Sequence, residues 1–182
     1  MKRTGQIVFA CLSLAIITMP EAARAQAVTE IGTNGVWSAY AFTEGNHKVC
    51  YIIAQPSHSE GNYTHRGDIY ALVTHRPSQG DHDVVSIMAG YPYKSSAQVQ
   101  LVIGARAFTL IGHDETAWAQ GADERDLIAA MKAGRGEMVV TGSSQRGTRT
   151  VDTFGLAGFT ASYALIEKAC PRRGSATSRQ TR

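Results

Sequence analysis

The chain has 182 residues, and its 18 basic and 15 acidic side chains give a net charge of +3 near neutral pH. This length suits one domain with a sizeable hydrophobic core. So small a charge excess is a weak argument for binding nucleic acid or membrane lipid, and we expect no nucleic-acid partner.

The first 25 residues have the layout of a secretory signal peptide. Two basic residues stand near the start, residues 7–18 (IVFACLSLAIIT) are apolar, and small residues follow Pro20. The pattern Ala-Arg-Ala at residues 23–25 predicts cleavage there, and Ala-Gln-Ala at residues 25–27 fits almost as well. The apolar run is too short to cross about 30 Å of hydrocarbon as a helix. We therefore expect export to the periplasm or the cell surface, without a transmembrane anchor in the mature chain.

Removal of residues 1–25 would leave 15 basic and 14 acidic residues, a net charge of +1. The last residues of the chain, 171–182, contain four arginines and no acid. They include no apolar residue large enough to bury, so we predict a solvated, disordered basic tail. A solubilising role is the favoured interpretation of this tail, and weak contact with anionic polysaccharide or lipid headgroups is the alternative.

The cysteine content predicts one disulfide. Cys11 lies in the predicted signal peptide, where Phe9 makes a poor lipoprotein motif, so Cys50 and Cys170 remain in the mature chain. An even number of cysteines in an exported protein favours a disulfide. A catalytic cysteine is the alternative, but the chain has no C-x-x-C motif, and His47 would point to the opposite face of a strand from Cys50.

Alternating apolar residues and turn signals make the body of the chain mostly strand. About eight strands are expected, over residues 36–44, 48–55, 68–76, 83–91, 98–104, 106–112, 136–142 and 148–156. Two further segments favour short helices: residues 123–134 begin with acids and end with Lys132 and Gly134, and residues 159–170 stop at Pro171. A β-sandwich with two short helices accounts for this pattern.

The order of these motifs resembles the invasion-associated locus B (IalB) family. The stretches that carry the resemblance are WSAYAFTEGNHKVCYIIAQP (37–56), RGDIYALVTHRP (66–77), SIMAGYPYK (86–94), FTLIGHDETAWA (108–119) and residues 127–170. They cover almost all of the mature chain, which we divide into an IalB-like domain at 26–170 and the tail at 171–182. The resemblance implies an exported envelope protein of alphaproteobacteria with an immunoglobulin-like β-sandwich and a link to host-cell invasion in some pathogens. It implies no catalytic residue and no cofactor.

Six histidines raise the question of a metal site, but no two of them have the i, i+2 or i, i+4 spacing of a local ligand pair. Asp81, His82 and Asp83 form the best cluster, and on a turn their three side chains are candidates for holding a weak cation. A polar hairpin tip with solvated side chains is the favoured interpretation, so we expect no metal and no other cofactor.

Motifs for catalysis are weak. Residues 142–150 (GSSQRGTRT) approach the pattern of a phosphate-binding loop, but Thr148 stands at the position of the required lysine. The chain has no G-x-S-x-G motif, although a Ser-His-Asp triad that only the fold assembles is an open alternative. We expect a non-enzymatic protein, with a periplasmic hydrolase or a metal-dependent enzyme as the alternative.

Aromatic residues supply the candidate contact surface. Tyr91 and Tyr93 flank Pro92 at a strand end and Lys94 follows, so these two tyrosines and the lysine are candidate binding residues. The favoured alternative is that both tyrosines cap the core of the sandwich. Other aromatic residues are expected to lie in the core: Trp37, Tyr40, Phe42, Tyr51 and Trp118.

These observations predict an exported, non-enzymatic envelope protein that binds an unidentified protein or envelope component, with support of host-cell invasion as the role that the resemblance implies. A general structural or stress-related envelope protein is a further alternative. An enzyme requires a concave pocket with convergent polar groups, whereas a binding protein requires an exposed apolar or aromatic patch.

Overall fold

The structure, a computed structural model, describes residues 27–95, 97–121 and 123–172. The predicted signal peptide and residues 173–182 of the predicted tail lie outside these ranges. No helix within the described ranges is long and apolar enough to cross a membrane.

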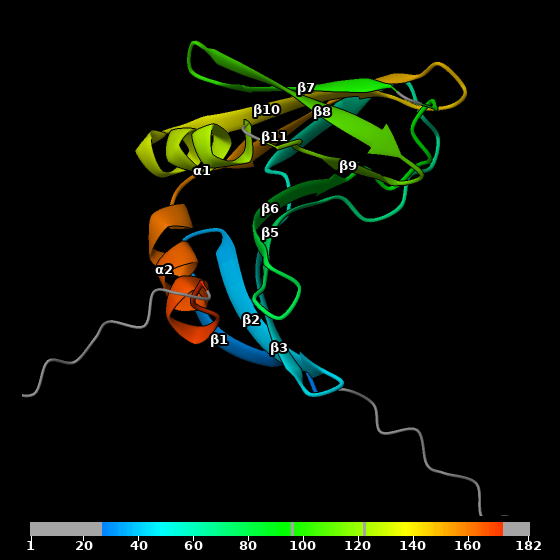
Figure 1. The fold of residues 1–182 in the computed structure, drawn as a ribbon. Helices are drawn as coiled ribbons and strands as arrows, with labels where there is room; N and C mark the ends of the chain where they lie inside the picture. Colours follow the sequence, from blue (N-terminus) through cyan, green and yellow to red (C-terminus); the bar gives the residue numbers. More distant parts are fainter. Residues whose placement is uncertain (1–26, 96, 122, 173–182) are drawn as a thin grey trace, which may run out of the picture.

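The described residues form eleven strands and two helices (Figure 1). The elements are β1 (Thr29–Asn34), β2 (Trp37–Glu44), β3 (His47–Ala54), β4 (His58–Gly61), β5 (Tyr70–Arg76), β6 (Asp81–Met88), β7 (Gln98–Ile103), β8 (Arg106–His113), β9 (Thr116–Trp118), α1 (Asp123–Ala133), β10 (Glu137–Ser143), β11 (Arg149–Gly155) and α2 (Phe159–Ala169). The mainly β fold with two helices is confirmed, but the expected number of eight strands is too low. The additional strands β1, β4 and β9 are short or polar and lack the apolar alternation from which strands are predicted.

The strands form one antiparallel sheet in the order β1-β2-β3-β5-β6-β9-β8-β7-β10-β11-β4. This sheet curls, so that β11 returns to the start of β2 and the end of β3. The backbone N–H of Ser57 donates to the Thr153 carbonyl at 2.8 Å, and the indole N–H of Trp37 donates to the Gly155 carbonyl at 2.9 Å. The curled sheet therefore surrounds one hydrophobic core, as in a β-sandwich.

The two helices cover different parts of the sheet. α1 packs on β6 and β8. α2 packs on β1, β2 and β3 (Figure 1). α2 begins against the β1–β2 turn, where Gly158 has a φ of 88° and Gly35 a φ of 56°. A Cβ on Gly158 would lie 1.9 Å from the carbonyl oxygen of Asn34, so the close approach of the two segments requires glycine. Ser162 then donates its hydroxyl to the Trp37 carbonyl at 2.8 Å, which holds the first turn of α2 on the sheet.

Strand alternation divides the aromatic residues of β2 and β3 between two faces. Trp37 is fully buried, but Tyr40, Phe42 and Tyr51 lie on the opposite face and are only partly buried. Tyr40 and Tyr51 stack there with 5.3 Å between ring centroids. Trp118 is 37% exposed. The prediction that these aromatic residues lie in the core is therefore correct for Trp37 and wrong for the other four.

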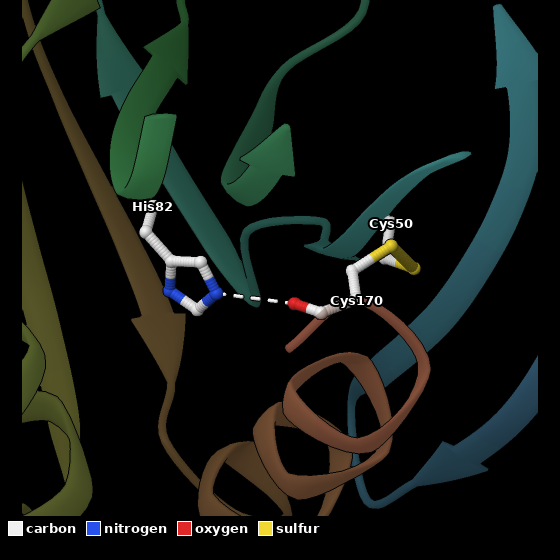
Figure 2. The surroundings of a disulfide bond; sticks show 3 residues. All are labelled: Cys50, His82 and Cys170. Carbon is white, nitrogen blue, oxygen red and sulfur yellow. Dashed lines mark hydrogen bonds between the residues drawn. A yellow bond between two sulfur atoms is a disulfide. The ribbon is translucent and has the colours of Figure 1, made fainter. Parts of the chain in front are cut away.

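A disulfide joins Cys50 in β3 to Cys170 at the end of α2, as predicted. The two Cα atoms are 6.0 Å apart, and both residues are buried. The bond spans a sequence separation of 120 residues and ties α2 to the sheet (Figure 2). In the chain-entropy account a loop of this size contributes roughly 4–5 kcal/mol to stability, because the bond restricts the unfolded chain.

We expect the double variant Cys50→Ala/Cys170→Ala to lose about 2–5 kcal/mol of unfolding free energy, because the unfolded chain regains the freedom that the disulfide removes. Urea unfolding followed by tryptophan fluorescence measures this loss. Reduction of the wild-type protein should lower the unfolding midpoint to a similar extent. A double variant as stable as the oxidised wild type would contradict the role assigned to this bond.

Candidate functional site

The structure places the predicted binding residues at different depths. Tyr93 is 2% exposed, whereas Tyr91 is half-buried and Lys94 is exposed. Gly112 and Gly142 leave the space that the Tyr93 ring occupies, since a Cβ on either glycine would lie 2.8 Å from that ring. Tyr93 therefore caps the core, as the favoured interpretation holds, and is not a contact residue. Tyr91 is the one of the two tyrosines that lines a cavity.

The cavity at Tyr91 has a volume of about 630 Å³ and is formed by three segments that lie far apart in the sequence. These segments are residues 62–67 before β5, residues 90–92 after β6, and residues 144–150, which span the β10–β11 turn and the start of β11. Tyr63, which is 38% exposed, and the exposed Arg146 line it together with Tyr91. Two aromatic rings and a cation thus share one concave surface.

A buried ion pair supports this cavity. The two terminal nitrogens of Arg66 donate to the two carboxylate oxygens of Asp152 at 2.8 and 2.6 Å, and Arg66 Nε donates to the Ala89 carbonyl at 2.5 Å. Both charged side chains are only 3% exposed. Burial alone would lower the pKa of Arg66, but the hydrogen bonds and the charge of Asp152 outweigh burial and raise this pKa. The guanidinium therefore stays charged and is held in a bidentate geometry.

Arg66 also positions the two tyrosines of the cavity. Its guanidinium carbon lies 4.8 Å from the centre of the Tyr91 ring and 5.5 Å from the centre of the Tyr63 ring. The Tyr91 hydroxyl shares a hydrogen bond of 2.7 Å with Thr150 Oγ1, and burial raises the pKa of Tyr91. Contacts within the protein thus hold the rings in place, which reduces the entropy that a partner must remove on binding.

The sequence analysis did not single out Arg66 or Asp152, although the position of Asp152 in the alternating pattern of β11 indicates a buried charge. Thr150, Asp152 and Phe154 alternate along β11 and share its buried face. A charged residue at an inward-facing strand position requires a buried partner. The sequence does not identify that partner, because Arg66 lies 86 residues from Asp152.

We expect Asp152→Asn to lower the unfolding free energy by about 3–5 kcal/mol, because the substitution leaves the Arg66 charge buried without its counter-ion. The double variant Arg66→Met/Asp152→Leu should lose less, since it removes both charges and keeps apolar volume. Denaturant unfolding measures both changes. An Asp152→Asn protein with wild-type stability, or a double variant less stable than it, would argue against this account.

The outer face of β2, β3 and β5 carries a second, more open groove of about 560 Å³. Its side chains include Tyr40, Tyr51, Ile53 and Tyr70, all partly buried. Tyr40 and Tyr51 are two of the aromatic residues that the sequence analysis assigned to the core. None of the described residues that line this groove is charged, so the groove is less selective than the cavity at Tyr91.

A further group of polar side chains, all buried except the half-buried Glu167, lies beside the disulfide, where the β5–β6 hairpin meets α2. Its members are His75, His82, Asp83, Tyr163 and Glu167. The register of β5 against β6 shifts between Thr74 and Arg76, and Asp83 has a positive φ of 64°. This irregularity turns both His82 and Asp83 inward, although consecutive residues of a regular strand face opposite sides.

This arrangement corrects the interpretation of Asp81, His82 and Asp83 as a solvated hairpin tip. Asp81 is exposed, but the side chains of His82 and Asp83 are only 5% and 6% exposed. The prediction was wrong because it assumed that polar residues beside a turn face water, whereas the bulge directs two of the three inward. The sequence analysis counted His75 among the six histidines but did not name it as a candidate site residue. Its position on the buried face of β5 is the signal that could have identified it.

Asp83 is the charged centre of this group. The Tyr163 hydroxyl donates to Asp83 Oδ1 at 2.6 Å, the Arg172 guanidinium pairs with Oδ2, and His75 Nε2 lies 3.3 Å from Oδ1. Burial alone would raise the pKa of Asp83, but His75, Tyr163 and Arg172 together hold it well below its usual range. Burial and the adjacent His75 ring lower the pKa of His82, so the carboxylate is charged while the His82 imidazole is neutral.

Both the cavity and this buried group fall largely within the part of the chain that has known relatives. Residues 37–167 match the family described as invasion associated locus B (IalB) protein. The chain belongs to the IalB family. The resemblance seen in the sequence is thereby confirmed. The matched region of this IalB protein contains the lining of the cavity, the Arg66–Asp152 pair and every member of the buried group from His75 to Glu167.

Among solved structures, this IalB-family fold is similar to the crystal structure of invasion associated protein b from Bartonella henselae. The two chains are 19% identical with a TM-score of 0.51, and the alignment covers 76% of this chain and 95% of the Bartonella chain. At this identity the likeness shows the fold alone, and it agrees with the predicted β-sandwich. No curated protein matches the chain in sequence.

Proposed function

We propose that this IalB-family chain is an exported, non-enzymatic envelope protein that binds a protein or envelope partner in the cavity at Tyr63, Tyr91 and Arg146. The observation that carries the proposal is the pair of tyrosine rings that Arg66 holds at an open cavity. Tyrosine and arginine are the residues that most often dominate binding energy at protein interfaces.

The charges around the cavity favour an acidic partner. Arg146 is an exposed cation among its lining residues, the exposed His65 offers a ring N–H, and none of the described side chains that line it is acidic. Arg66 is already neutralised by Asp152, so its part is to hold the tyrosines. A partner segment with a carboxylate or another anionic group near an aromatic or apolar group matches this surface.

Export and the invasion role rest on other observations. The predicted signal peptide and the confirmed disulfide both fit a protein that folds in an oxidising compartment. The invasion role comes from the family description and from the name of the Bartonella protein. Binding of an envelope or host component in the cavity would give a physical basis for the invasion role that the family description suggests.

A photo-crosslinking phenylalanine analogue in place of Tyr63 should form an adduct with the partner in illuminated cells, because position 63 lies at the cavity. Val102 is the matched control, since it is 37% exposed, compared with 38% for Tyr63, and does not line the cavity. Immunoblotting and mass spectrometry identify the adduct. Arg146→Ala in the position-63 protein should weaken the adduct band. Equal adducts at positions 63 and 102, or none at 63, would contradict the proposed site.

Protease treatment tests export separately. We expect the protein to be digested either in intact cells, which places it on the surface, or only after the outer membrane is opened, which places it in the periplasm. A cytoplasmic marker that stays intact in the same samples is the control. Protection that persists until the inner membrane is broken would exclude export.

A further inference from the structure

Three buried ring nitrogens beside the disulfide make no hydrogen bond within the part of the chain that the structure describes: both nitrogens of His75, and Nδ1 of His82. His75 is 0% exposed, and the side chain of His82 is 5% exposed. Buried polar atoms of native proteins are nearly always paired. Three ring nitrogens without a hydrogen bond, two of them within 3.3 and 3.7 Å of one carboxylate oxygen, therefore indicate a ligand that imidazole nitrogens bind.

The hydrogen bonding of His82 determines which of its nitrogens is available. His82 Nε2 lies 3.1 Å from the carbonyl oxygen of Cys170, which can only accept a hydrogen bond (Figure 2). In the neutral ring Nε2 therefore carries the hydrogen, and Nδ1 has a free lone pair. Histidines that bind metals have this arrangement, in which one nitrogen coordinates the ion and the other donates to a carbonyl or a carboxylate.

Two carboxylates lie next to these rings. Asp83 Oδ1 is 3.3 Å from His75 Nε2 and 3.7 Å from His82 Nδ1. One donor atom each from His75, His82, Asp83 and Glu167 lies within 4.8 Å of the other three. Zinc with four ligands at about 2.0–2.2 Å in a tetrahedron separates neighbouring ligands by roughly 3.3–3.6 Å. Small side-chain movements are enough to bring the four donors to that spacing.

We propose that His75, His82, Asp83 and Glu167 bind one divalent cation of the zinc class. Two imidazoles and two carboxylates suit zinc better than magnesium or calcium, which prefer oxygen ligands alone. A histidine that coordinates a metal ion binds through a ring lone pair and adds no charge, so the two carboxylates balance the charge of the cation. The thiolates that would compete for zinc are absent from the site, because Cys50 and Cys170 form the disulfide.

The residues around the four ligands hold them in place. The Tyr163 hydroxyl donates to Asp83 Oδ1 at 2.6 Å, and Arg172 pairs with the other carboxylate oxygen, so Oδ1 is the oxygen that faces the histidines. Tyr163 and Glu167 are four residues apart on α2 and therefore share one face of the helix. The cation would join the β5–β6 hairpin to α2 within contact of the disulfide. Tyr163 is a positioning residue in this arrangement.

The test uses the oxidised protein after EDTA has removed bound metal. Isothermal titration with zinc chloride should give one equivalent of tightly bound zinc and a higher melting temperature. Titration with cobalt chloride should give the visible absorption bands of four-coordinate Co²⁺, a signature that a merely structural cluster does not produce. Absence of stoichiometric zinc binding by the wild-type protein would overturn the proposal.

Two variants and two controls locate the ion. Glu167→Gln keeps the shape of the half-buried ligand but removes its charge, and it should weaken zinc binding more than about tenfold. Tyr163→Phe removes the hydrogen bond to Asp83 and should weaken zinc binding about 10–100-fold. Glu124→Gln removes a nearby acid that is not a ligand, and His113→Asn removes an exposed histidine; both should bind like the wild type. Wild-type affinity in Glu167→Gln, or loss of binding in His113→Asn, would overturn the proposal. The cavity at Tyr63 is not involved, so failure here leaves the proposed partner site untouched.

Discussion

The bond between Cys50 and Cys170 is the constraint on which the other features depend, because it fixes the end of α2 against the sheet. The start of the same helix is fixed at Gly158, whose backbone packs directly on the β1–β2 turn. Held at both ends, α2 presents Tyr163 and Glu167 to the β5–β6 hairpin. A helix attached only by apolar packing would hold these polar side chains less rigidly.

Two sets of buried charges each include a carboxylate on the inward face of a strand, Asp152 of β11 or Asp83 of β6. The two sets differ in how well their polar atoms are satisfied by hydrogen bonds. The Arg66–Asp152 pair offsets its desolvation with two parallel hydrogen bonds and a third to the backbone. Within the described residues, the set around Asp83 leaves both nitrogens of His75 and one nitrogen of His82 without a hydrogen bond. The first set is complete as it stands and supports a cavity, whereas the second has the donors of a cation site.

The two proposed sites of this IalB-family domain have different roles: the cavity binds the partner, and the cation stabilises the fold. At the cavity, contacts with Arg66 position Tyr63 and Tyr91 before any partner arrives. Beside the disulfide, a cation would add a second link between the hairpin and α2. A domain closed by a disulfide and a bound cation would suit the exported protein that we propose, because disulfides persist outside the cytoplasm.

The sequence by itself determined the strand-rich fold, the two helices and the disulfide, because these follow from local periodicity, helix end signals and the number of cysteines. The family followed separately, from the resemblance of five stretches in their order along the chain. It did not determine which side chains face inward. Tyr40 faces outward beside the buried Trp37, and a bulge turns His82 and Asp83 into the interior. Only the tertiary structure decides such positions, because they depend on strand register and on the meeting of segments far apart in the chain.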